Sequence, residues 1–549
     1  MTLHSILIIS FVLLALGLFT FKQEKYLRLC AIASACIVAL LLVLATLLNN
    51  NFSYSIISYQ DFVNFNFPIY SMAVMFGVAF ILSVTFLLIH KKIHYKELAI
   101  ILIYFVGATG ILVANDIFSL LIYWELVALS GSLIVNFSLH PHASNTALKY
   151  FTIHAISGVC LMIGLIDYSI TYSTSYLPHS TFSLSDPMNY FLLLGILINL
   201  GLPPVASWVV DGYSKCSSNA SLFLSIFTTK SALFLLLRFF YGNHQLIYIG
   251  ILIALYGMIF SAFQTNIRRI LAYSIIHQIG LTIIGISAVA YSNGLIISYI
   301  IVGVLYKLVF FMVAALLFDI TKTEDIYKLK GAINIKSMLG VVIIITALQS
   351  LGLPFTGGFI VKSSLLDDIT QMSLTWLDYT MLLAMAGTAL NIGVRLPYYL
   401  LNFKNNSKVN FKKRGLNNKI ILPLLIIVVL LQAIAFVHFT QFTNLENITH
   451  ALEVFGLGFI LFYIGYHLIN EEALLKIINN SIVLLHQTTI SFLRLFTSTI
   501  LLKALNRSAV STYTYLVSLQ FNYNILTSRI IYLILVFMCL IYMVIKWHS

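Results

Sequence analysis

The feature that most constrains this chain is a series of long apolar runs, since a helix needs about 20 apolar residues to cross a bilayer. These runs dominate the sequence: of its 549 residues, 60% are hydrophobic and only 9% are charged. An average soluble domain is about one quarter charged, and a disordered chain is poor in apolar residues. The composition therefore excludes both an ordinary cytosolic enzyme and a disordered protein. It predicts an all-α polytopic membrane protein.

Sixteen apolar runs are long enough to be candidate spans, with ends good to a few residues. They lie near 3–21, 28–48, 69–90, 96–114, 116–136, 149–169, 190–210, 219–240, 245–263, 270–290, 294–318, 337–370, 378–402, 419–440, 452–469 and 529–546. The stretch 471–528 has sparse charges between apolar runs. It predicts an amphipathic helix along the membrane face or against neighbouring protein, with an extra membrane-buried pair of helices as the alternative.

The positions of the basic residues orient these spans. Most of the 31 Lys and Arg residues lie in loops that follow odd-numbered spans. Basic residues collect on the cytoplasmic side of membrane proteins, so the N-terminus is expected outside and the loop 403–418 inside. The net charge of +13 then reflects membrane orientation rather than nucleic-acid binding. The five cysteines are scattered without metal-ligand spacing, so neither a metal site nor a disulfide framework is predicted.

Two segments of the chain echo each other at the places where a span is interrupted. Asn199-Leu-Gly-Leu-Pro-Pro-Val-Ala-Ser-Trp208 in the seventh span resembles Ser350-Leu-Gly-Leu-Pro-Phe-Thr-Gly-Gly-Phe359 in the twelfth. The expected helix breaks are at Pro203 and Pro204 in the first segment and at Gly352 and Pro354 in the second. The two spans are five apart, so they cross the membrane in opposite directions, as in an inverted repeat. Paired broken helices of this kind indicate an ion or substrate path.

The main ionisable candidates inside the predicted spans are Glu125, Lys230, Lys307 and Lys362. Burying such a group near mid-bilayer costs at least about 2.5–3.5 kcal/mol, so it is a functional candidate by default. One buried carboxylate with several buried lysines suits proton handling, because desolvation and neighbouring charges shift lysine between its two forms. The alternative is that Glu125 and one lysine form a static pair that fixes helix register.

Three further polar residues within spans are secondary candidates. His154 and His277 are each either a hydrogen-bonded packing histidine or a proton relay. Arg395 is near a helix end, where it either snorkels to the surface or lines the cytoplasmic exit.

The ordered motifs resemble the antiporter-like subunits shared by respiratory complex I and the multisubunit Mrp-type cation/proton antiporters. The resemblance covers residues 70–400 and rests on several segments. They are Trp124-Glu-Leu, Ala147-Leu-Lys-Tyr-Phe, Leu202-Pro-Pro-Val-Ala-Ser-Trp-Val-Val-Asp211, Phe227-Thr-Thr-Lys-Ser-Ala-Leu-Phe-Leu-Leu-Leu-Arg238, Asn266-Ile-Arg-Arg-Ile-Leu-Ala-Tyr-Ser274, Gln278-Ile-Gly280, Leu305-Tyr-Lys-Leu and Gly352-Leu-Pro-Phe-Thr-Gly-Gly-Phe-Ile-Val-Lys362. Asp211, in the third segment, joins the secondary candidates.

The resemblance implies about fourteen core helices with inverted five-helix repeats, spans 4–8 and 9–13, with helices 7 and 12 broken and a C-terminal extension. It implies an ion path through Glu125, Lys230, Lys307 and Lys362. The chain departs from the family at two places. Asn199 stands where the family has a seventh-span lysine, and Tyr299 and Gly303 stand where histidines are often found. Glu125 must therefore pair elsewhere, with Lys230 for example, or be held protonated.

The expected domain organisation follows the repeats. Residues 1–95 form spans 1–3, 96–240 the first repeat, 245–402 the second, 403–470 spans 14–15, and 471–549 the lateral segment and last span.

The predicted function is proton or monovalent-cation translocation within a multisubunit membrane complex, most like the D subunit of a Mrp-type Na+/H+ antiporter. A proton-pumping subunit of an NADH-quinone oxidoreductase and a transport-inactive scaffold are the alternatives. No catalytic residue, metal or cofactor is predicted in this chain, so any redox chemistry belongs to partner subunits. The expected partners are other hydrophobic subunits, protons, Na+ or K+ and lipid, without nucleic acid. The expected location is the bacterial inner membrane, with the mitochondrial inner membrane as the alternative.

Overall fold

The computed structural model describes residues 66–90, 95–178, 181–288, 293–370, 372–402, 421–438 and 445–468. The predicted spans near 3–21, 28–48 and 529–546, the loop 403–418 and the segment 471–528 lie outside these ranges. The described residues are mostly helical, as expected. Seven helical stretches among them are long and apolar enough to cross a membrane. They are Lys96–Val113, Ile117–Asn136, Ala143–Tyr172, Ser218–Phe240, Ile267–Ser287, Ile296–Thr321 and Trp376–Leu400.

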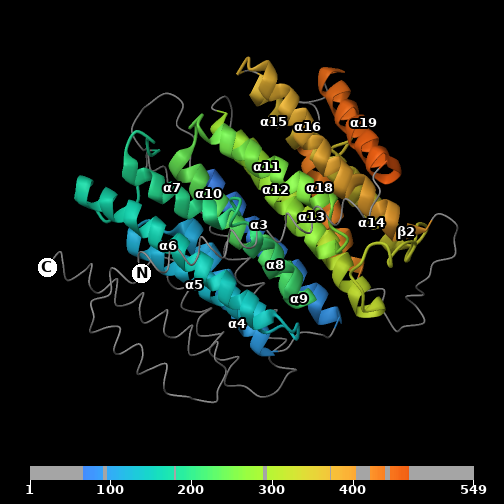
Figure 1. Cartoon of the computed structure of the whole chain (residues 1–549), viewed down its shortest axis with the longest axis horizontal. Coiled ribbons are helices and arrows are strands. Elements are labelled where there is room, and N and C mark those ends of the chain that lie inside the picture. The colour runs from blue at the N-terminus through green and yellow to red at the C-terminus, as the bar shows by residue number, and fades with distance from the viewer. Residues whose placement is uncertain are drawn as a thin grey trace.

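The helices lie side by side in one bundle (Figure 1). Their bounds are α3 Asn66–His90, α4 Tyr95–Val113, α5 Ile117–Asn136, α6 Ala143–Tyr172, α7 Pro187–Asn199, α8 Ser207–Lys215, α9 Ser218–Ile226, α10 Thr228–Phe240, α11 Leu246–Ala262, α12 Ile267–Ser287, α13 Asn293–Thr321, α14 Met338–Leu351, α15 Gly357–Thr370, α16 Thr375–Thr388, the π-helix η1 Ala389–Arg395, α17 Leu396–Leu400, α18 Ile421–His438 and α19 Leu445–Leu468. A short parallel pair joins β1 Ile333–Asn334 to β2 Leu401–Asn402. Helices α12 and α13 lie between the α4–α6 group and the α14–α16 group.

Both predicted helix interruptions are present. Helix α7 ends at Asn199 and α8 begins at Ser207, so Pro203 and Pro204 lie between two half-helices. Helix α14 ends at Leu351 and α15 begins at Gly357, with Pro354 in the gap. Gly352 follows α14 with φ 72°, a left-handed conformation that glycine adopts without a Cβ penalty. The proline and glycine signals in the sequence therefore placed both breaks correctly.

A third break, in the predicted eighth span, has no such signal. Helices α9 and α10 meet at Phe227, whose φ of −96° and ψ of −67° end the first and start the second. The Phe227 ring packs against aromatic rings of α3 and α4, with centroid distances of 5.1 Å to Phe76, 5.6 Å to Tyr104 and 5.5 Å to Phe105. Tertiary packing thus fixes this break, and it lies three residues before Lys230.

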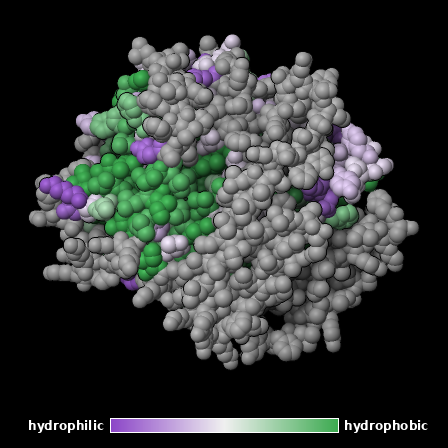
Figure 2. Space-filling model, turned by 180° about the vertical axis from the view of Figure 1, so that it is seen from behind, coloured by the Kyte–Doolittle hydropathy of each residue, from purple (hydrophilic) through white to green (hydrophobic). Residues whose placement is uncertain are grey.

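An apolar patch lies on the described part of the bundle in the view from behind (Figure 2). Exposed apolar side chains include Leu422, Ile426 and Val429 on α18 and Tyr248 and Leu252 on α11. Contiguous exposed apolar patches often mark contact with protein or membrane. The surface suits contact with lipid or with other membrane subunits.

Candidate functional site

Three buried lysines hold their ammonium groups on main-chain carbonyls. Lys230 Nζ donates to Ser225 O at 2.7 Å, and Lys362 Nζ donates to Ser350 O at 2.6 Å. Lys307 Nζ donates to Ser274 O at 2.8 Å. The three side chains are at most 8% exposed. In the described part of the chain, none of them forms an ion pair with a carboxylate.

The helix breaks explain how Lys230 and Lys362 are held. The last carbonyls of a helix have no partner within it, and they form the negative end of the helix dipole. Ser225 lies at the end of α9, and Ser350 and Leu351 end α14, so each lysine meets a half-helix C-terminus. Lys362 also donates to Leu351 O at 3.4 Å. The breaks therefore supply negative potential to buried ammonium groups without a carboxylate.

Lys307, on α13, is held differently, by a residue that sequence analysis did not assign. Its Nζ donates to Gln278 Oε1 on α12, and Gln278 Nε2 donates to Tyr299 O at 3.2 Å. A Cβ at Gly303 would collide with the Gln278 amide. Tyr299 and Gly303 are the positions where the family often has histidines, so a glutamine from the neighbouring helix takes that space. The only sequence signal was the Gln278-Ile-Gly280 motif.

The first half of the chain places Glu125, His154 and Asn199 around α6. A Cβ at Gly158, on α6, would collide with Glu125 Oε1, so the carboxyl group from α5 fits against a glycine. Among the described residues, neither Glu125 Oε1 nor Asn199 Oδ1 has a hydrogen-bond partner, although both atoms are buried. Glu125 forms no ion pair with Lys230 there. The pairing that we considered for Glu125 is therefore not present.

His154, on α6, packs between two aromatic rings. Its ring stacks on Tyr150 with centroids 4.1 Å apart and meets the edge of Trp208 at 4.3 Å. Trp208 Nε1 donates to Ile198 O at 3.0 Å, at the end of α7. These contacts bring α6, the α7 terminus and α8 together next to Asn199.

Asp211 forms a junction of ion pairs at the end of the bundle where α6 and α12 begin. Its carboxylate lies 2.9 Å from Lys149 Nζ, 3.0 Å from Lys215 Nζ and 3.3 Å from Arg269 Nη2. Burial raises the pKa of the Asp211 carboxyl group, but the three cations outweigh burial and hold the pKa well below its usual range. The residue therefore stays ionised and ties α6, α8 and α12 together.

We expect Asp211→Asn to lower the free energy of unfolding by about 2 kcal/mol, less than for a fully buried pair because the cations are partly exposed. The wild-type advantage should be complete above the unfolded-state pKa, about 3.9. It should disappear as the pH falls through the lowered folded-state pKa. Thermal unfolding of the purified chain in detergent measures this difference. Asp167→Asn, at the other end of α6, is the control, and an equal loss there would contradict the assignment.

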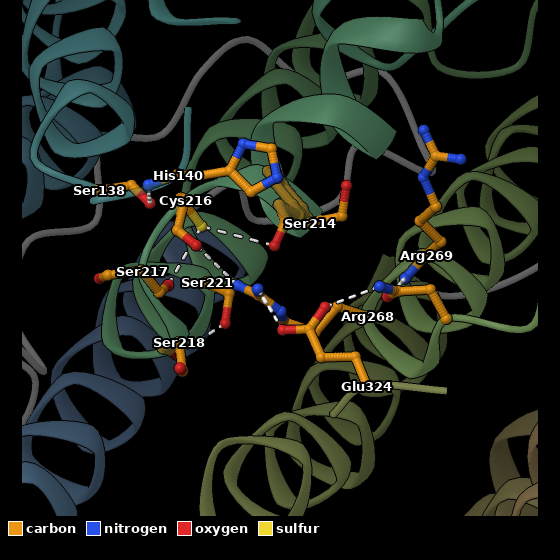
Figure 3. Close-up of polar contacts among 12 residues, drawn as sticks. Ser138, His140, Ser214, Cys216, Ser217, Ser218, Ser221, Arg268, Arg269 and Glu324 are labelled. Carbon is orange, nitrogen blue, oxygen red and sulfur yellow. Dashed lines mark hydrogen bonds and ion pairs between the residues drawn. The ribbon is translucent and has the colours of Figure 1, made fainter. Parts of the chain in front are cut away.

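A second ionic junction fixes the start of α9 (Figure 3). Arg268 Nη1 donates to Cys216 O at 2.7 Å, and the same guanidinium pairs with Glu324. Asn266 Nδ2 donates to the other Glu324 oxygen at 2.7 Å. Ser217, the N-cap of α9, donates to Glu97 Oε1 at 2.6 Å. Helix α9 is thus anchored at its first turn, and its last turn presents Ser225 O to Lys230.

Within the second half, His277 and Arg395 connect other helices to α11. His277 bridges Ala254 O, at 2.8 Å from Nδ1, and Thr388 Oγ1, at 3.1 Å from Nε2. Arg395, at the end of the π-helix η1, donates to Ala262 O at 2.6 Å and Gln264 O at 2.8 Å. The arginine therefore binds the free carbonyls at the α11 C-terminus. A π-helix often marks a functional site, and sequence analysis did not anticipate this one.

Comparison with known proteins identifies the family. The family model described as "NADH:quinone oxidoreductase/Mrp antiporter, TM" matches residues 114–390, and these include Glu125 and all three buried lysines. The chain belongs to this family.

Relatives within the family come from both kinds of complex. The M subunit of the NADH-quinone oxidoreductase of Pseudomonas aeruginosa is 26% identical, over 46% of this chain and 55% of that protein. The D subunit of the Na(+)/H(+) antiporter of Bacillus subtilis is 24% identical, over 47% of this chain and 56% of that protein. The chain thus spans about half the length of these relatives. A chain of the Mrp complex from Dietzia sp. has the same fold, with TM-score 0.65 and 15% identity over 84% of this chain and 99% of that chain.

Proposed function

We propose that this family member translocates protons or monovalent cations as one component of a multisubunit membrane complex, most like the D subunit of a Mrp-type antiporter. The observation that carries the proposal is the set of three buried lysines held on carbonyls without carboxylates. A subunit that served only as scaffold would gain nothing from burying three ammonium groups, each costing several kcal/mol in a membrane. The matched relatives support an antiporter-type subunit of either complex.

In this proposal the lysines are coupled electrostatically. Lys230, Lys307 and Lys362 are all buried in one helical bundle. Like charges in a poorly solvated interior disfavour each other, so protonation of one lysine favours release of a proton from the next. Carbonyl partners accept hydrogen bonds from either form of the amine. In this proposal the proton moves along Lys230, Lys307 and Lys362, while Glu125 and Asn199 form a first half without a lysine of its own.

The organisation that accompanies this function is also proposed. The paired interruptions α7–α8 and α14–α15 support inverted repeats over residues 96–240 and 245–402. The bacterial inner membrane is the proposed location, and other hydrophobic subunits are the proposed partners. The alternative is a proton-pumping subunit of an NADH-quinone oxidoreductase, which the match to the Pseudomonas aeruginosa protein supports. Proteins that co-purify in mild detergent distinguish the two: quinone-binding or hydrogenase-like partners favour the alternative.

Flux measurements separate transport from a scaffold role. Sealed vesicles carrying the wild-type chain with its co-purifying subunits should move protons in response to a Na+ or K+ gradient, above vesicles without the chain. Asn199→Lys should change this flux, because it gives Glu125 a cationic partner. If the chain is only a scaffold, the wild type should carry no proton flux, and flux should appear only in the Asn199→Lys variant. That result would refute the proposal.

A further inference from the structure

A small cavity opens beside Lys362, away from the other two lysines. Its lining includes Lys362, Gly352 and Ser363 on one side and His450, Ala451 and Val454 of α19 on the other. The volume open to the centre of a water molecule is about 20 Å³, and about 10–15 Å³ suffices to hold one water. The lysine and the histidine therefore share a space that can hold water between them.

Gly352 keeps this space open on the lysine side. A Cβ at Gly352 would lie 2.8 Å from Lys362 Cδ, so the glycine that ends α14 also makes room for the lysine stem. On the other side, α19 packs against α15 and α16 and lies beside them in Figure 1. Phe359 and Ile360 of α15 pack against Ile448 and Ala451. These contacts fix the position of His450 relative to Lys362.

His450 connects the cavity to the surface. Its side chain is 27% exposed, and Nδ1 lies 3.1 Å from Glu453 Oε2, whose side chain is 54% exposed. When Nδ1–H donates to Glu453, the neutral ring carries its acceptor lone pair on Nε2. Three charged or titratable groups act on this histidine: Glu453 on α19, Asp378 on α16 and Lys362 across the cavity.

We propose that the translocation path leaves Lys362 through this cavity, with His450 exchanging protons with bulk water and Glu453 positioning its ring. This inference rests on the proposed function. A proton leaves Lys362 Nζ through water to neutral His450, and the resulting imidazolium then releases it to bulk water. His450 thereby returns to its neutral form, and Lys362 regains a proton from Lys307 in the proposed series. Histidine suits this step because its usual pKa, about 6.5, is close to neutral pH. In the predicted topology, the His450 end of this cavity faces the outer side of the membrane.

A cysteine-access experiment tests the path without requiring transport. Lys362→Cys is placed in the full chain with its five native cysteines replaced by serine, and sealed vesicles are treated with a small cationic methanethiosulfonate from either side. Reaction is expected from the outside, and Ala451→Trp should slow it at least about tenfold by filling the cavity. Leu457→Trp, on an exposed part of the same helix, should leave it unchanged. An unchanged rate in Ala451→Trp would overturn the proposal.

Flux through the complex tests the role of His450. We expect His450→Ala to lower flux at least about fivefold and external imidazole to restore part of it, as for a lost proton-transfer group. Glu453→Gln should lower flux less than His450→Ala does, because it alters the contact that positions the ring and leaves the ring itself in place. His244→Gln, at an exposed position, should have no effect. Full flux in His450→Ala would overturn the inference. Absence of flux in the wild type would instead refute the proposed function, and the cysteine reaction would still decide whether the path exists.

Discussion

Lys362→Ala should abolish coupled transport, whereas Asn199→Ala should lower it by less than about twofold. Loss of a proton-transfer group typically costs 10²–10⁴-fold in rate, and Lys362 is the titratable group that meets the end of α14 and the cavity facing α19. Asn199 cannot take up a proton, and its buried Oδ1 has no hydrogen-bond partner among the described residues. Proton flux in vesicles, compared at equal protein content, measures both effects.

Lys362→Met is the matched control for this pair, because methionine keeps much of the apolar stem that packs against Gly352 and removes only the ammonium group. Lys362→Met should abolish coupled transport, as Lys362→Ala should. Equal losses from Lys362→Ala and Asn199→Ala would show that Asn199 belongs to the path, for example by orienting water. Retained transport in Lys362→Ala would favour the scaffold.

Lys230→Met and Lys307→Met should each lower cation/proton exchange by on the order of 100-fold, because each removes one member of an electrostatically coupled series. Lys307→Met also removes the donor that Gln278 Oε1 accepts from. The stability of this variant should therefore be checked by thermal unfolding. Exchange of protons against Na+ or K+ in vesicles provides the main measurement.

Lys328→Met, at an exposed position in the loop after α13, is the control and should exchange ions normally. Unchanged exchange in both Lys230→Met and Lys307→Met would show that the lysine series is not a relay. A loss in only one of them would restrict the path to the part of the series that contains that lysine.

Local sequence signals predicted the burial of three lysines in the candidate site. A lysine within an apolar run can be recognised from sequence alone, so Lys230, Lys307 and Lys362 could be expected inside the bundle. Glycine and proline act on their own backbone, so the breaks after Asn199 and Leu351 were also predictable.

The remaining parts of the site depend on contacts between distant segments. The break at Phe227 results from rings on α3 and α4, and its own segment has no glycine or proline. Gln278 reaches Lys307 only because Gly303, on another helix, leaves room. His450 lies 88 positions after Lys362 in the sequence, and only the packing of α19 against α15 brings the two to one cavity. Periodicity and composition carry no information about such pairs.

Because the lysines bind main-chain carbonyls, residue identity at most of the binding positions need not be preserved among homologues. Ser225, Ser274, Ser350 and Leu351 can change their side chains and still offer the same backbone oxygen, so they could diverge among functional homologues. Thr229 and Gln278 differ, because their side chains bind Lys230 and Lys307. Alanine scanning would pass over the carbonyl positions, although their backbone holds the charge. Sensitivity to substitution should instead concentrate at residues that set the backbone path, such as Gly352. A screen for transport-defective variants should therefore report the helix breaks and the side-chain partners such as Gln278, and it should miss the residues that offer only a backbone carbonyl.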